Sequence, residues 1–306
     1  MSKLLLIDGN ALMHRAYHAL PPFKTSKGIP TNMVFGFFSV LHKSVVDFQP
    51  SHLLVCFDTP ARTFRNDLYE KYQAQRPKVD DDFIQQIPLI KEAVQASNIV
   101  QIEKDGFEAD DLIGTISNLF HDQVLILTGD KDIMQLVNDH IIVVSPQIGF
   151  SKSHLYNKEE VWNKLKVFPS QIPDYKALAG DPSDNYPGAK GIGPITAQKL
   201  IKQYNTVENL YAQINNMEKG RIKSILIECK ENVLMAKKLA IIITDVNLNI
   251  NPEQAKFTWF DEKLNAYLLQ LEMYSMSKRI FERKNSKPIT KKKNETKEPK
   301  PQLSLF

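Results

Sequence analysis

The residues best suited to chemistry lie in a short acidic run near the middle of the chain. Residues 105–113 read Asp-Gly-Phe-Glu-Ala-Asp-Asp-Leu-Ile, so the carboxylates of Glu108, Asp110 and Asp111 crowd into four positions. One acid at a helix start complements the helix dipole. Three acids together repel one another and raise each other's pKa unless a cation lies among them. The run therefore indicates either an over-charged helix start or a cation site.

More aspartates follow short apolar runs that are typical of strands buried on both faces of a parallel sheet. The runs at 3–7, 53–57 and 124–127 are followed by Asp8, by Asp58, and by Asp130 with Asp132. Helical patterns at 34–46, 83–96 and 110–120 lie between them, which predicts an α/β domain. Ligands of such sheets bind beyond the carboxyl ends of the strands, so these acids should meet at one edge. An aspartate after a strand is also an ordinary turn residue.

Asp181 and Asp184 add two more carboxylates, three positions apart. The candidate ligands then number nine: Asp8, Asp58, Glu108, Asp110, Asp111, Asp130, Asp132, Asp181 and Asp184. No matching set of histidines or cysteines accompanies them, which favours Mg²⁺, with Mn²⁺ as a substitute. Two such ions about 4 Å apart stabilise the attacking and leaving oxygens of a phosphoryl displacement.

Two segments suit a nucleic acid. Residues 59–82 interleave cations with aromatic side chains, a mixture that fits a single strand but also describes a solvated helix face. These side chains are Arg62, Arg65, Lys71, Arg76 and Lys78 with Phe64, Tyr69 and Tyr72. The run Gly191-Ile192-Gly193-Pro194 precedes a helical pattern and could hold a phosphate, or be a structural turn. It lacks the Gly-Lys-Ser/Thr ending of an ATP-binding loop.

Composition sets the remaining bounds. The 306 residues suffice for one large or two modest domains. Two distant cysteines, Cys56 and Cys229, make no disulfide framework and fit a reducing cytosol. No signal peptide or bilayer-spanning run is evident, so a cytoplasmic location without membrane attachment is expected. Removing the nine candidate ligands from the 35 acidic residues leaves the 39 basic residues in excess by 13, which favours a polyanionic partner.

Together the motifs resemble the flap endonucleases, in particular the 5′-to-3′ exonuclease domain at the front of bacterial DNA polymerase I. The resemblance covers residues 1 to about 280. It is carried by Leu5-Leu6-Ile7-Asp8-Gly9-Asn10, Arg15-Ala16-Tyr17-His18-Ala19, Phe57-Asp58, Phe64-Arg65, Gly106-Phe107-Glu108-Ala109-Asp110-Asp111, Thr128-Gly129-Asp130-Lys131-Asp132, Gly180-Asp181, Ser183-Asp184-Asn185 and Gly191-Ile192-Gly193.

The resemblance implies a PIN-like (resolvase-like) nuclease domain at 1–165, with a parallel sheet and a helical arch at about 60–98. A smaller, all-helical domain of the helix-hairpin-helix type should follow at 166–284, and a disordered basic tail at 285–306. No polymerase segment follows, so a free-standing, monomeric form is expected. This chain departs from the family pattern at one position of the arch. The family usually has a lysine there, and this chain has Gln73.

The resemblance also assigns roles to residues. Two Mg²⁺ ions are implied, the first held by Asp8, Asp58, Glu108, Asp110 and Asp111, the second by Asp130, Asp132, Asp181 and Asp184. Arg76 is the expected catalytic cation, with Lys71 as a substitute for the missing lysine. DNA contacts are expected from Arg15, Tyr17, Arg65, Tyr72, Lys176, Lys190, Gly191, Gly193 and Lys199. Carbonyls of Leu178, Ala179, Pro187, Ala189 and Ile192 match positions that hold K⁺ in relatives.

The implied substrates are DNAs with 5′ ends, nicks or 5′ flaps, including RNA–DNA primers, in replication and repair. The last five residues, Gln302, Leu303, Ser304, Leu305 and Phe306, resemble the short motif by which bacterial DNA enzymes bind the sliding clamp. The same residues could instead be a C-terminal staple on the helical domain.

Three other functions share part of this pattern. A non-catalytic DNA-structure binder should have lost some of the acids. A PIN-type ribonuclease should lack the Gly-Ile-Gly turn. A metal-dependent phosphatase would need neither the arch nor the basic tail.

Overall fold

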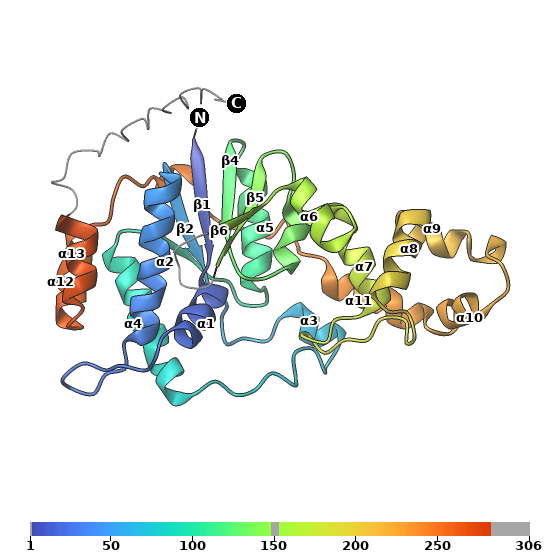
Figure 1. Cartoon of the computed structure of the whole chain (residues 1–306), viewed down its shortest axis with the longest axis horizontal. Coiled ribbons are helices and arrows are strands. Elements are labelled where there is room, and N and C mark those ends of the chain that lie inside the picture. The colour runs from blue at the N-terminus through green and yellow to red at the C-terminus, as the bar shows by residue number, and fades with distance from the viewer. Residues whose placement is uncertain (1, 148–152, 283–306) are drawn as a thin grey trace, which may run out of the picture.

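The computed structural model describes residues 2–147 and 153–282, which form a six-stranded sheet flanked by helices (Figure 1). The strand order is β3-β2-β1-β4-β5-β6, with β1 to β5 parallel and β6 antiparallel to β5. The strands are β1 (Lys3–Asp8), β2 (His52–Cys56), β3 (Val100–Ile102), β4 (Gln123–Leu127), β5 (Ile141–Pro146) and β6 (Ser153–Tyr156). The predicted parallel α/β fold is confirmed, and the three apolar runs are its adjacent central strands.

Both faces of the sheet are covered, which explains the uninterrupted apolar runs. On one face Leu5 and Ile7 join the core made with α1 (Gly9–Ala19), α2 (Asn32–Phe48) and α4 (Asp81–Ala96). On the other face Leu4 and Leu6 pack with α5 (Ala109–Leu119). Successive strand residues point to opposite faces, so one run serves two cores. None of the described helices is long and apolar enough to cross a bilayer.

The remaining helices extend the molecule away from the α5 face of the sheet (Figure 1). They are α6 (Lys158–Leu165), α7 (Ile172–Ala179), α8 (Pro194–Tyr204), α9 (Val207–Ala212), α10 (Arg221–Glu228) and α11 (Lys230–Ala240), with 3-10 turns η2 (Pro169–Gln171) and η3 (Ile214–Asn216). The 3-10 turn η1 (Asp132–Leu136) follows β4, and η4 (Pro252–Ala255) lies beside β2. One apolar cluster runs from Leu112 of α5 through Leu178 of α7 to Leu200 of α8. The helical part therefore shares a core with the α5 face of the sheet.

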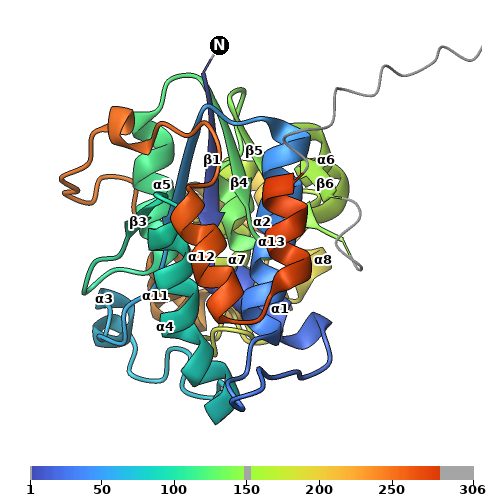
Figure 2. The same ribbon diagram turned by 90° about the vertical axis from the view of Figure 1, so that its left-hand side faces the viewer.

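The end of the described chain corrects the predicted second domain of 166–284. Helices α12 (Glu262–Gln270) and α13 (Tyr274–Phe281) return to the sheet and lie beside α2 and α4 (Figure 2). Leu264, Leu268 and Ile280 are completely buried in the core of that face. An apolar helical pattern predicts the helices, but not which part of the molecule buries them.

The predicted helical arch at about 60–98 is also corrected. Residues 81–96 form α4, which packs on the sheet with α2 and α12. The segment before it holds one short helix, α3 (Phe64–Leu68), followed by turns. Pro88 lies inside α4 without ending it. The segment between β2 and α4 is thus shorter than the predicted arch, and most of it is not helical. The predicted tail, including Gln302–Phe306, lies outside the described residues.

The packing of α12 against the core predicts that two neighbouring leucines differ in how much they contribute to the free energy of unfolding. Leu268 is fully buried and its neighbour Leu269 is 43% exposed. We expect Leu268→Ala to lower the free energy of unfolding by about 2–5 kcal/mol, because it leaves a cavity in the core. The matched control Leu269→Ala should change it by no more than about 0.5 kcal/mol. Urea denaturation measures both, and equal effects would contradict this placement of α12.

Candidate active site

Three neighbouring strands deliver carboxylates to one open pocket of about 320 Å³. β1 ends at Asp8, Asp58 follows β2, and Asp130 follows β4. The pocket is lined by seven of the nine predicted acids: Asp8, Asp58, Glu108, Asp110, Asp130, Asp132 and Asp184. The sheet edge was predicted to bring such acids together because parallel strands end on the same side.

Local geometry fixes Asp8 at the centre of this edge. Its Oδ1 accepts a hydrogen bond from Ala11 N at 2.9 Å, so it caps α1, and its Oδ2 accepts one from Thr128 Oγ1 at 2.6 Å. A side chain at Gly9 would meet the Phe57 ring at 2.4 Å, so only glycine lets β1 and β2 end this close together. Burial raises the pKa of Asp8 to about 7.

Asp58 ties the end of β2 to the start of α5. Its Oδ1 accepts a hydrogen bond from Ala109 N at 2.6 Å, while its own N–H donates to Asn10 Oδ1 at 3.1 Å. Burial raises its pKa, although the Ala109 hydrogen bond opposes that rise. The N-terminus of α5 therefore stabilises a carboxylate from another strand as well as its own acids.

Glu108 and Asp110 stand at the start of α5 and face the pocket. Glu108 accepts hydrogen bonds from Thr63 Oγ1 at 3.3 Å and from Tyr72 Oη at 3.2 Å. Burial raises the pKa of Glu108 to about 7. Burial, together with the charges of Asp130 and Asp8, also raises that of Asp110. These carboxylates lack enough positive charge to hold them ionised, which is the condition that a cation would relieve.

Asp111 has a different role from the predicted one. Its two oxygens accept hydrogen bonds from Arg65 Nη1 at 2.7 Å and Nη2 at 2.8 Å, and both residues are buried. The same oxygens also accept from Ile243 N at 2.8 Å and Glu108 N at 3.1 Å. Asp111 therefore has no free oxygen for an ion, and it does not line the pocket.

Arg65, a predicted DNA contact, is equally committed. Besides Asp111, it donates from Nε to the Leu239 carbonyl at 3.0 Å and from Nη2 to the Ile241 carbonyl at 2.8 Å. Its side chain is only 3% exposed. The pair thus fastens α3 and the end of α11 to α5, and it corrects both predictions. Removing one partner of such a buried pair strongly destabilises the fold, because the other charge is left buried without a partner.

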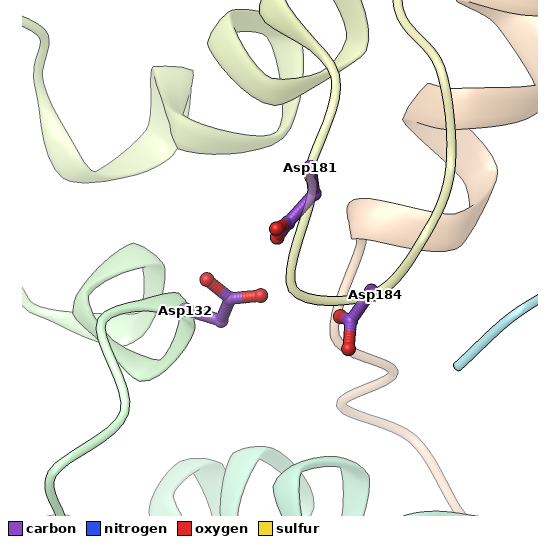
Figure 3. A group of neighbouring side chains, drawn as sticks. All are labelled: Asp132, Asp181 and Asp184. Carbon is purple, nitrogen blue, oxygen red and sulfur yellow. The ribbon is translucent and has the colours of Figure 1, made fainter. Parts of the chain in front are cut away.

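A second group of carboxylates lies where η1 meets the loop after α7. Asp132, Asp181 and Asp184 each offer an oxygen within 4.8 Å of the others, and Figure 3 shows them converging. Lys176 of α7 forms ion pairs with both Asp132 and Asp181 and is largely buried. Its ammonium and the Ser183 hydrogen bonds outweigh burial and lower the pKa of Asp181. Lys176 is therefore part of this cluster, and its predicted contact with DNA stays a prediction.

The segment after α3 meets the second group through Asp184. Asp184 Oδ1 accepts from Arg76 Nη2 at 2.8 Å and Gln73 Nε2 at 3.1 Å, and Oδ2 accepts from Tyr72 Oη at 3.3 Å. Lys71 is exposed and does not line the pocket. The position next to the acids belongs to Gln73 rather than to the predicted substitute, Lys71.

The other predicted contacts lie on two surfaces. Lys190, Gly191, Gly193 and Lys199 are exposed around the start of α8, and Gly191 has a left-handed φ of 102°. Arg15 and Tyr17 lie on α1, and Tyr17 Oη donates to Asp80 Oδ2 at 3.1 Å. Of the predicted potassium ligands, the Leu178 carbonyl already accepts from Ala189 N at 2.9 Å and the Ala189 carbonyl from Ile192 N at 2.8 Å.

Sequence reasoning missed several pocket residues. Asn10, His14 and Thr63 line the pocket, and Thr128 orients Asp8. Asn10 and Thr128 stand inside the acidic motifs, directly after the Asp-Gly and before the Gly-Asp, so their spacing was a usable signal. His14 carried none, because one histidine on a helix usually indicates a surface or core position.

Two family descriptions match the chain in succession. Residues 3–166 match "5′-3′ exonuclease, N-terminal resolvase-like domain", and residues 167–263 match "5′-3′ exonuclease, C-terminal SAM fold". The chain belongs to the 5′-3′ exonuclease family. It is therefore a nuclease, with the resolvase-like and helical parts described above.

Similar proteins include two that bear the family's name. The chain is 38% identical to a 5′-3′ exonuclease of Aquifex aeolicus, over 92% of the chain and 96% of that protein. It is 38% identical to one of Bacillus subtilis, over 94% and 99%. It is also 40% identical to DNA polymerase I of Caldicellulosiruptor bescii, over 91% of the chain but only 33% of that polymerase.

Solved structures share the fold at lower identity. The T5 5′-exonuclease with bound zinc superposes with a TM-score of 0.67 at 20% identity, over 92% of this chain and 98% of that one. The catalytic core of Rad2 with a DNA substrate superposes with a TM-score of 0.58 at 16% identity, over 91% and 92%.

The buried acids predict how stability depends on pH without divalent cations. The pKa of Asp8 and that of Glu108 are about 7 in the folded protein, above their ordinary values of 3.8 and 4.5. The folded state thus binds these protons more tightly than the unfolded state. Their stabilising effect is present at low pH and is lost as pH rises towards and through 7, by up to about 1.4 kcal/mol per pH unit for each group.

We therefore expect the melting temperature in EDTA to fall between pH 5 and pH 8. Mg²⁺ should raise it more at pH 8, where the carboxylates are ionised, and Asp8→Asn should flatten the profile. Scanning calorimetry over this range measures all three. An equal Mg²⁺ effect at both ends of the range would contradict the assignment of these acids to a cation site.

Proposed function

We propose that the chain is a structure-specific 5′-3′ exonuclease and 5′-flap endonuclease that hydrolyses DNA phosphodiesters with two divalent cations. The observation that carries this proposal is the pocket at the sheet edge, where seven carboxylates meet within reach of Arg76. Family membership supports the reaction class. Removal of RNA primers and flaps in replication and repair, in the cytoplasm and as a monomer, is the biological role that we propose.

The donor set fits hard cations. Every candidate ligand is a carboxylate, and several have a pKa raised by burial, so their charge is incompletely balanced by the protein. We propose Asp8, Asp58, Glu108 and Asp110 for the first Mg²⁺, with Mn²⁺ as a substitute. We propose Asp130, Asp132, Asp181 and Asp184 for the second. Asp111 is left out because Arg65 occupies its oxygens.

When bound, such ions lower the pKa of the attacking water and stabilise the charge on the attacking and leaving oxygens. The protein's own residues then have defined tasks. Arg76, whose side chain is 55% exposed, exchanges its bond with Asp184 for the phosphate being cut and stabilises the charge that develops there. Tyr72 orients Glu108 through its hydroxyl. The products carry the 5′ phosphate.

We propose that the start of α8 binds the DNA duplex through its backbone phosphates. Gly193 caps this helix without a side-chain hydrogen bond, and Pro194 at its first position has no N–H to satisfy. The amides of the Gly191–Gly193 turn, with exposed Lys190 and Lys199, suit a backbone phosphate. Arg15 and Tyr17 are proposed to contact the strand near the pocket. Tyr72 is no longer proposed for this role, because it is only 4% exposed and its hydroxyl is bonded to Glu108 and Asp184. We also propose that K⁺ binds the backbone carbonyls of residues 178–192 that match the potassium ligands of relatives.

A single assay tests the reaction. We expect the chain with Mg²⁺ to cut a 5′-flap DNA and to leave a matched substrate made wholly of RNA uncut, whereas a PIN-type ribonuclease would do the reverse. Asp130→Asn should lower the rate at least about 100-fold with DNA binding retained, because it removes a pocket charge. Asp139→Asn, whose side chain is 91% exposed outside the pocket, is the matched control and should keep full rate. Full activity of Asp130→Asn, or in excess EDTA, would refute the two-cation mechanism.

The final residues support a second, independent proposal. Gln302-Leu303-Ser304-Leu305-Phe306 is proposed to bind the bacterial sliding clamp and so to hold the nuclease at high effective concentration near nicks. Deleting residues 302–306 should abolish binding to purified clamp in a calorimetric titration and leave the cutting of free flap DNA unchanged. Retained clamp binding, or a lower melting temperature of the deletion variant, would favour a staple on the fold.

A further inference from the structure

The loop that carries Asp181 and Asp184 is a closed hairpin. Asp181 N donates to the Tyr186 carbonyl at 3.0 Å, and Tyr186 N donates to the Asp181 carbonyl at 3.2 Å. Asn185 takes a left-handed φ of 58° and donates from its amide to the Lys71 carbonyl at 2.7 Å. The backbone of Tyr186 is therefore fixed directly opposite one of the candidate ligands.

The ring of Tyr186 is buried, but its hydroxyl is not satisfied. The side chain is 3% exposed and packs in a small apolar cluster with Tyr72, Leu239 and Ala240, with its ring stacked on Tyr72 at 6.4 Å between centroids. Its Oη is buried and has no hydrogen-bond partner within the described ranges. A buried hydroxyl without a partner is unfavourable, so its presence here calls for a reason.

The surroundings of that hydroxyl supply one. The charges of Lys176 and of the three carboxylates of the second group all act on the Tyr186 hydroxyl, so the hydroxyl lies beside that group. Those carboxylates are Asp181, Asp132 and Asp184, the three that converge in Figure 3. A neutral phenol at their border is both a donor and an acceptor.

The charges of the second group limit how a cation is held there. Lys176 already pairs with Asp132 and Asp181, and Arg76 pairs with Asp184. Two positive side chains thus balance most of three negative ones. An ion such as Mg²⁺ loses its water reluctantly, so in this partly neutralised setting it should keep several water molecules. Groups that bind those waters then decide its affinity.

We infer that the Tyr186 hydroxyl accepts a hydrogen bond from a water molecule of the cation held by Asp132, Asp181 and Asp184. Tyr186 is thus a positioning residue for the second ion. This inference rests on the proposed two-cation function and extends it to a residue that carries no charge.

The test is Mn²⁺ binding to the full chain without DNA, measured by electron paramagnetic resonance of free Mn²⁺. Wild type should bind two ions, and Asp184→Asn should identify the second site by weakening it. Tyr186→Phe should raise the dissociation constant of that site about 10-fold and leave the first site unchanged. The matched control is Tyr211→Phe, which also removes one tyrosine hydroxyl, donated to the Leu226 carbonyl at 3.0 Å, and should bind as wild type.

Two results would overturn the inference. Unchanged Mn²⁺ binding by Tyr186→Phe would do so directly. A lower melting temperature of Tyr186→Phe in EDTA would show that the hydroxyl stabilises the cation-free fold, whereas the inference expects an equal or higher one. Failure of the proposed function is seen separately, because wild type would then bind fewer than two ions before any tyrosine is changed.

Discussion

The structure depends on holding several negative charges together in a partly buried pocket. Asp8, Glu108 and Asp110 all have a raised pKa, and burial is the leading cause in each case. Like charges in a medium of low polarity repel strongly, so a fold that gathers them must also supply positive charge. The start of α5 supplies backbone N–H groups, and three side chains supply full charges: Arg65, Lys176 and Arg76.

These three cations differ in how firmly they are committed. Arg65 is 3% exposed and makes two hydrogen bonds to Asp111 and two to carbonyls, so it is a structural member of the core. Arg76 is 55% exposed and makes one hydrogen bond to Asp184, a partly exposed pair that costs little to break. Lys176 lies between these extremes. Burial thus separates the cation that maintains the fold from the one that is free to act on a ligand.

The sequence predicted what local pattern controls. Apolar runs that end in aspartates identified β1, β2 and β4, and parallel strands must end on one side, so most of the pocket followed. Asp111 could not be separated from Asp110 in this way. Adjacent helical residues point about 100° apart, and which one faces the pocket depends on how α5 packs. That depends on Arg65, which comes from a distant segment. The packing of α12 also depends on distant segments. Its sequence pattern therefore predicted a helix, but not that the helix packs in the core with α2 and α4.

Gln73 shows why a departure from a family pattern needs its contacts to be interpreted. From spacing alone, we predicted that Lys71 substitutes for the lysine that the family has at the position of Gln73. In the structure Gln73 donates to the same Asp184 oxygen as Arg76, at 3.1 Å. An ammonium at that point would nearly neutralise a carboxylate already paired with a guanidinium, and a divalent ion would bind it less well. An amide keeps the hydrogen bond that fastens the segment to the hairpin, adds no charge, and so leaves Asp184 more of its attraction for a cation.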